Sequence, residues 1–126
     1  MFTEFQRVMA NLHQAHEAVR VAGDQAEAEL RRRCPDLQDE ALHEMLRKDE
    51  ALQCKFEAMA DAAGEFARMI GRRELKRWMK KNVSPGVIEQ FHNTVEGFAR
   101  GQLDAAHRVL SEIELAKLRK LRRKAS

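Results

Sequence analysis

Apolar residues recur at alternating steps of four and three residues through the first third of the chain. The positions of this seam are Phe5, Met9, Leu12, His16, Val19, Gly23, Ala26 and Leu30. A mean period of about 3.5 residues is typical of helices that pack side by side at small angles. Because proline disfavours helical conformation at the residue before it, Cys34-Pro35 should end this helix, and Thr3 can cap its start. We therefore expect a first helix over about residues 3–33.

A second seam begins after Pro35, which suits the first turn of a helix. Its positions are Leu42, Met45, Asp49, Leu52, Phe56, Met59, Ala63, Phe66 and Ile70. Beyond it the apolar stripe moves sideways, to Leu75, Trp78 and Met79. A stutter of four residues would absorb this shift inside one helix, whereas Gly71 would equally suit a break. We favour one continuous second helix over about residues 36–81.

A third seam follows the segment 82–86, where Ser84 is a candidate cap and Pro85 a candidate first helical residue. Its positions are Ile88, Phe91, Val95, Phe98, Gln102, Ala106, Val109, Ile113 and Ala116. We expect a third helix over about residues 85–122. Short connections make neighbouring helices antiparallel. The seams therefore predict one domain over residues 1–126, an elongated, coiled-coil-like, antiparallel three-helix bundle.

Composition supports an all-α fold class. Ala, Glu, Lys, Leu and Arg make up 67 of the 126 residues, whereas Val, Ile and Thr make up only 12. This bias is typical of long helices and disfavours a sheet. No apolar run approaches the ~20 residues of a membrane span, and no secretory or transit segment is visible at the start. We expect a soluble intracellular protein whose two separated cysteines, Cys34 and Cys54, are reduced and at least half-buried.

The second helix is longer than the first, so the ends of the second and third helices should project as a hairpin tip over about residues 71–95. Apolar side chains of this tip would then be covered only by one another. They are Leu75, Trp78, Met79, Val87, Ile88 and Phe91. Exposed apolar patches of this kind mark interfaces, so we interpret the tip as a candidate binding surface.

Charge is concentrated at the same tip, since residues 72–84 contain six basic residues and one acidic residue. Residues 35–71 contain nine acidic and four basic residues. The predicted partner-binding residues are Arg72, Arg73, Leu75, Lys76, Arg77, Trp78, Met79, Lys80, Lys81, Ile88 and Phe91. A second basic cluster comprises Lys117, Arg119, Lys120, Arg122, Arg123 and Lys124. Both clusters would suit an acidic partner, nucleic acid or anionic lipid, but cations in the last turns of helices also complement the helix dipole.

Candidate chemistry is sparse. Two Glu-x-x-His pairs, Glu40/His43 and Glu89/His92, have the spacing of di-iron helical proteins, but the bundle would hold them far apart. We therefore expect no metal and no cofactor. The chain has no phosphate-binding glycine loop, nucleophile elbow or HExxH motif, so we expect no catalytic site.

Two seam positions and one group of small residues also need an interpretation. His16 is expected to be a hydrogen-bonded core residue, and Asp49 to fix register or to pair with a base near Lys117. The small residues near Gly64 and Gly101 are expected to allow close helix packing.

The sequence thus favours a non-enzymatic helical adaptor or assembly subunit. Its partner would be another helical protein, an acidic partner or a second copy of the chain. The alternative is an accessory protein that binds nucleic acid through basic helix ends, with nucleic acid or an anionic membrane as the less favoured partner. Salt would distinguish the two functions, because phosphate contacts make affinity fall steeply with ionic strength.

Overall fold

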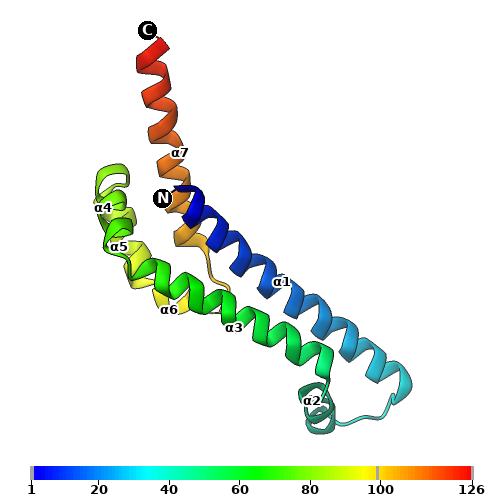
Figure 1. Cartoon of the computed structure of the whole chain (residues 1–126). Coiled ribbons are helices and arrows are strands. Elements are labelled where there is room, and N and C mark those ends of the chain that lie inside the picture. The colour runs from blue at the N-terminus through cyan, green and yellow to red at the C-terminus, as the bar shows by residue number, and fades with distance from the viewer. Residues whose placement is uncertain (1, 99, 126) are drawn as a thin grey trace.

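The computed structural model describes residues 2–98 and 100–125, and every regular element within them is a helix (Figure 1). The all-α prediction is therefore confirmed. The helices are α1 (Phe2–Arg33), α2 (Asp39–Arg47), α3 (Glu50–Ile70), α4 (Arg73–Asn82), α5 (Pro85–Asn93), α6 (Val95–Phe98) and α7 (Asp104–Ala125).

The frame of the molecule is an antiparallel pair formed by α1 and α3 (Figure 1). The predicted first helix is confirmed, since α1 ends at Arg33, two residues before Pro35. We call the end of this pair that carries α2 the distal end, and the end that carries α4, α5 and α7 the proximal end. The C-terminus and α2 lie at opposite extremes of the molecule.

The continuous second helix predicted over residues 36–81 is wrong, because the chain breaks it twice. At the first break Asp49 is the N-cap of α3, and its Oδ1 accepts a hydrogen bond of 2.9 Å from the Leu52 amide. The predicted register role of Asp49 is therefore wrong. At the second break Arg72 has extended backbone, with φ −73° and ψ 132°, and α4 starts after it. Of the two interpretations of Gly71, the break holds.

The third predicted helix is also divided, into α5, α6 and α7. Pro85 begins α5 as expected, but the Ser84 side chain makes no capping hydrogen bond. Its hydroxyl and its amide instead donate to the two carboxylate oxygens of Glu112 on α7, at 2.8 and 2.7 Å. Between α6 and α7 the chain turns through Gly101, whose φ of +83° lies in the left-handed region that favours glycine.

The main hydrophobic core lies at the proximal end. Its aromatic centre joins four elements, with ring centroids 5.9 Å apart for Phe5 and Phe66, 6.1 Å for Phe5 and Phe91, and 5.1 Å for Phe91 and Phe98. Around these rings pack Val8, Met9, Leu12, Met69, Leu75, Met79, Val109 and Ile113. One core therefore unites the two ends of the chain.

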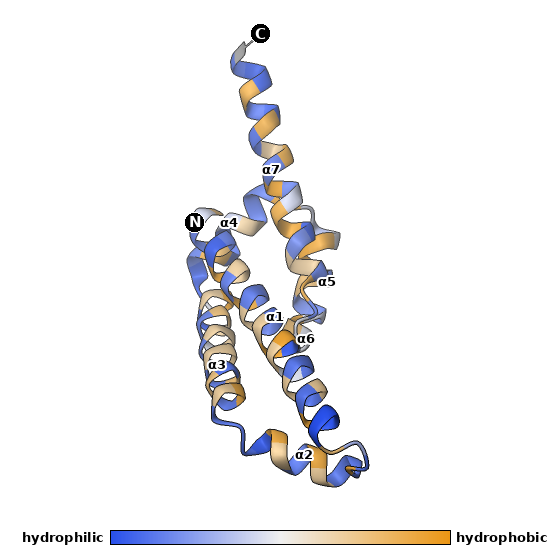
Figure 2. Ribbon diagram, turned by 90° about the vertical axis from the view of Figure 1, so that its right-hand side faces the viewer, coloured by the Kyte–Doolittle hydropathy of each residue, from blue (hydrophilic) through white to orange (hydrophobic). Residues whose placement is uncertain are grey.

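The prediction of a projecting hairpin tip over residues 71–95 is also wrong. The breaks before α4 and after α5 let these helices pack against the proximal end, so Leu75 and Met79 are 1% exposed and Phe91 is 0% exposed. Trp78 is half-buried, with its ring centroid 6.2 Å from that of Phe2 and 6.3 Å from that of Phe5. The segment that projects alone is the second half of α7, as both views show (Figure 2).

Two further predictions concern the cysteines and membrane-spanning helices. Cys34 and Cys54 are free thiols, but both are exposed, so the prediction that they are at least half-buried is wrong. Within the helices of residues 2–98 and 100–125, none combines the length and the apolar content needed to cross a bilayer.

Candidate functional site

The strongest candidate for a binding surface is the exposed side of α4. With about 100° between successive residues, Leu75 and Met79 lie on one side of this helix and enter the core. The opposite side, which we call the α4 cationic face, consists of Arg73, Lys76, Arg77, Lys80 and Lys81, all exposed. Five positive charges thus share an arc of about 140° on a helix of 10 residues.

The charges of the α4 cationic face are not paired within the described residues, where none of its five residues forms an ion pair. The neighbouring Arg72 is different, because its guanidinium contacts Glu4 at 2.5 Å and Glu74 at 2.8 Å. Hydrogen bonding to Glu4, followed by the charge of Glu4, raises the pKa of Arg72 above its usual value. Arg72 therefore links α4 to α1 through an ion pair, whereas the α4 cationic face can bind a partner.

The start of α4 changes the interpretation of these charges. The sequence alone placed them in the last turns of a long helix, where cations complement the dipole. Lys80 and Lys81 do lie in the last turn of α4, but Arg73 is its first residue and Lys76 lies in its N-terminal half. Cations near a helix N-terminus are disfavoured by the dipole. Helix termination therefore does not explain Arg73 and Lys76.

A groove adjoins this face between α4 and α5, with a volume of about 330 Å³. We call it the α4–α5 groove. The residues that line it are Lys76, Arg77, Met79, Lys80, Ile88 and His92. Met79 and the half-buried Ile88 form an apolar floor, and the charged residues form its rim. Five predicted partner-binding residues meet here, and His92 is the lining residue that the prediction missed.

The other predicted site residues do not join this surface as expected. Leu75 and Phe91 lie in the core, at 1% and 0% exposed, and Trp78 packs against α1. Arg72 is engaged with Glu4 and Glu74. Arg73 and Lys81 remain on the α4 cationic face, beside the groove.

The two Glu-x-x-His pairs lie on different elements. Glu40 and His43 are on α2 at the distal end, and Glu89 and His92 are on α5 at the proximal end. All four side chains are exposed. Among the residues described, no group of three or more His, Cys, Asp or Glu is arranged to hold a metal ion.

His16 does not have the hydrogen bond expected of it. Its Nε2 is buried and has no hydrogen-bond partner among the described residues. The ring instead packs on the turn before α7, where a Cβ added to Gly101 would lie 3.2 Å from the His16 Nδ1. The His16 ring therefore packs between α1 and the turn at Gly101.

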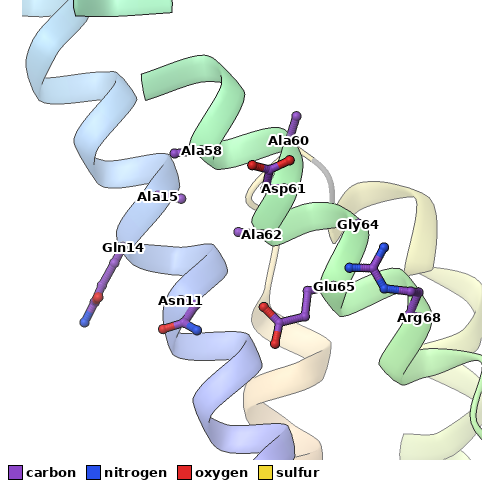
Figure 3. Close-up of a pocket in the computed structure, with 10 residues that line it drawn as sticks. All are labelled: Asn11, Gln14, Ala15, Ala58, Ala60, Asp61, Ala62, Gly64, Glu65 and Arg68. Carbon is purple, nitrogen blue, oxygen red and sulfur yellow. The ribbon is translucent and has the colours of Figure 1, made fainter. Parts of the chain in front are cut away.

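A shallow hollow of about 740 Å³ lies between α1 and α3 (Figure 3). Small side chains line it from both helices, among them Ala15, Ala58, Ala62 and Gly64. One lining residue, Glu65, pairs with Arg7 at 3.1 Å. The predicted packing of the small residues near Gly64 against those near Gly101 is not seen, because Gly64 lies beside this hollow and Gly101 meets His16 of α1.

Two apolar surfaces at opposite ends of the molecule also lack cover. On the projecting half of α7, Leu115 and Leu118 are each 53% exposed and Leu121 is 62% exposed. At the distal end, a groove of about 430 Å³ opens between α1, α2 and α3. Neither surface was among the predicted partner-binding residues.

Comparison with protein-family models, with curated proteins and with solved structures finds no match for this chain.

Proposed function

We propose that the chain is a non-enzymatic helical adaptor that binds an acidic segment of another protein through the α4 cationic face. The observation that carries this proposal is the position of Arg73 and Lys76 at the start of α4. The dipole disfavours cations there, and neither residue has an ion-pair partner among the described residues. An anionic partner would supply the missing counter-charge.

The α4–α5 groove favours a protein partner over a nucleic acid. Its apolar floor of Met79 and Ile88 beside cations matches the apolar centre and polar rim of protein interfaces. An acidic helix that carries one large apolar side chain would use both parts. A phosphate backbone would use the cations and leave the floor empty. An intracellular site belongs to the same proposal, because exposed free thiols such as Cys34 and Cys54 persist in reducing compartments.

The α4 cationic face also supports the alternative function, a nucleic-acid-binding accessory protein, since five clustered cations can neutralise phosphates. The two functions differ in salt dependence. For duplex DNA the slope of log affinity against log salt is about −0.9 per phosphate neutralised. An acidic peptide held partly by its apolar side chain would show a shallower slope.

The test compares two probes, a labelled 20-residue helical peptide of Glu and Leu and a 20-base-pair DNA duplex. The variant Arg73→Glu/Arg77→Glu/Lys80→Glu should weaken peptide binding by about threefold to a hundredfold, since each of the three exposed contacts is worth about 0.2–1 kcal/mol. The matched control Arg31→Glu/Arg32→Glu/Arg33→Glu changes the net charge equally at the distal end and should leave binding unchanged. Melting temperatures would verify that both variants fold.

Ile88→Gln separates the two functions further, because it alters only the groove floor. It should weaken the peptide and leave the duplex unaffected. A steep salt slope, with the duplex preferred and Ile88→Gln silent, would instead establish the alternative. Equal losses in both triple variants, or no binding of either probe, would contradict both functions.

A further inference from the structure

The second half of α7 has the composition of a helix that binds a surface with both apolar and acidic residues. Residues 115–124, which we call the α7 tail, contain three leucines, six cations and no acidic residue. The leucines at 115, 118 and 121 are more than half exposed. The tail leaves the body at Lys117, whose Nζ lies 3.7 Å from the centroid of the Phe2 ring, and continues with no element beside it (Figure 2).

The distal groove has the complementary properties. Its apolar lining comes from three helices and comprises Val19, Gly23, Leu46, Leu52 and Phe56. Phe56 is 41% exposed. The lining also includes two acidic residues, Asp24 and Glu27, and two basic residues, Arg20 and Arg47. Over residues 17–57 the chain contains eleven acidic and seven basic residues, so the excess negative charge lies around the groove and not in its lining. Anchors spaced three residues apart on one helix are the usual ligand of such a groove.

The α7 tail cannot enter the distal groove of its own chain. Lys117 is held beside Phe2, and Val19 lies 17 residues further along the straight helix α1, about 26 Å away. The tail also points away from the distal end (Figure 1). Any contact between these two surfaces must therefore join two molecules.

We propose that the α7 tail of one molecule occupies the distal groove of a second copy. In a side-by-side antiparallel pair, each tail would lie at the distal end of the other molecule, so two such contacts would form about one twofold axis. Opposite charge favours this pairing. Direct pairing of two tails is disfavoured, because it would bring twelve cations together without a carboxylate.

An anionic membrane is a weaker match for the tail. An interfacial helix buries an apolar face that is free of charge, whereas the three leucines of the tail span about 120° of the helix and Arg122 lies between Leu115 and Leu118. A lipid surface is accordingly an outcome that the experiment should exclude.

The test measures self-association by sedimentation velocity up to about 100 μM protein, a range in which contacts of micromolar affinity are visible. The tail variant Leu118→Gln/Leu121→Gln should weaken association by at least about tenfold. The groove variant Gly23→Gln should do the same by filling the groove, since a Cβ at Gly23 meets no atom within 4 Å. Matched controls are Val21→Gln, another exposed apolar residue of α1, and Gly86→Gln, where a Cβ also meets nothing.

Mixing the two variants provides the decisive result. The groove variant keeps an intact tail and the tail variant keeps an intact groove, so their mixture should associate more tightly than either alone. A mixture that does not recover would indicate contact between identical surfaces and overturn the proposal. A wild type that stays monomeric would overturn it too, as would a monomer that uses Leu118 and Leu121 to bind phosphatidylserine vesicles.

Discussion

The two ends of the α1–α3 pair use apolar and charged residues in opposite ways. The buried residues of α1 are Phe5, Val8, Met9 and Leu12, all in its proximal half. Its distal half has no buried residue, but its arginines are paired, for example Arg31 with Glu27 at 3.1 Å and Arg33 with Glu29 at 2.9 Å. At the proximal end, by contrast, the α4 cationic face has no ion pairs within the described residues.

The residues that stabilise the fold are therefore not the residues that are available for binding. Exposed ion pairs contribute about 0–1 kcal/mol each, so the distal end is held mainly by the few apolar residues buried there, such as Leu42 on α2 and Leu52 on α3. The proximal end is held by its aromatic core, and the α4 cationic face adds no ion pair to it within the described residues. The comparison indicates that a basic cluster identifies a binding surface only when its ion pairs are known, because Arg31–Arg33 and the α4 cationic face are both basic clusters on helices, and only the first forms ion pairs among the described residues.

The largest expected effect tests where stability resides. Phe91→Ala removes a ring that is 0% exposed and should lower the free energy of unfolding by about 3–5 kcal/mol. Phe56→Ala removes the same side chain at the distal end, where it is 41% exposed, and should cost less than about 1.5 kcal/mol. Urea denaturation measures both. Similar losses would show that the two ends are equally packed.

A smaller effect is expected at the turn before α7. Gly101→Ala places a Cβ 3.2 Å from the His16 Nδ1 and forces alanine to a φ of +83°. We expect a loss of about 1–3 kcal/mol. Gly86→Ala is the control, since a Cβ there meets no atom within 4 Å. If both variants unfold at the same urea concentration, the proximal turn contributes nothing specific.

The third prediction concerns the distal end. Asp49→Ala removes the cap of α3 and should cost about 1 kcal/mol. The control Asp61→Ala lies within α3 and should stabilise it slightly, by up to about 0.7 kcal/mol, because alanine has the higher helix propensity. Hydrogen exchange in Asp49→Ala should accelerate in α2 and in the first turns of α3, while the proximal core keeps its protection. Uniform acceleration would mean that the two ends unfold as one unit.

The smallest effect is a pH dependence of the distal end. Hydrogen bonds from Arg20 to Glu17 and from Arg32 to Glu29 lower the pKa of each carboxyl below its usual value. Their contribution is therefore complete above the pKa of the unfolded chain and is lost as pH falls through the lower folded-state pKa. Glu29→Gln should reduce this acid sensitivity of hydrogen exchange in α1. Glu57→Gln is the charge-matched control on α3, and an equal change there would contradict the assignment.

The sequence predicted the helices better than their breaks. The seam of α1 is regular and Pro35 ends it, so its bounds followed directly. A stutter and a break at Gly71 leave the same hydrophobic pattern, and only the contacts of Arg72 with α1 distinguish them. The break before α3 had a readable signal, since aspartate is a preferred N-cap residue, but the place of Asp49 in the seam obscured it.

The candidate site was predicted in part for the same reason. Lys76, Arg77 and Lys80 are cations among apolar residues in the sequence. They stay on the exposed side of the helix whether or not the helix is broken at Gly71. Leu75 and Phe91 were assigned to the surface because a continuous helix would project beyond the bundle. His92 was missed because it meets α4 only after α4 and α5 become separate helices packed against each other.

The core that joins both ends of the chain also bears on biosynthesis. Phe5 and Met9 are made well before the core residues Phe91, Val109 and Ile113 that pack with them. Contacts between residues so distant in sequence form late and slow folding. During translation α1 and α3 can pair as a local hairpin, but their apolar proximal surfaces stay open until α7 leaves the ribosome. We expect chaperones to bind the nascent chain during that interval.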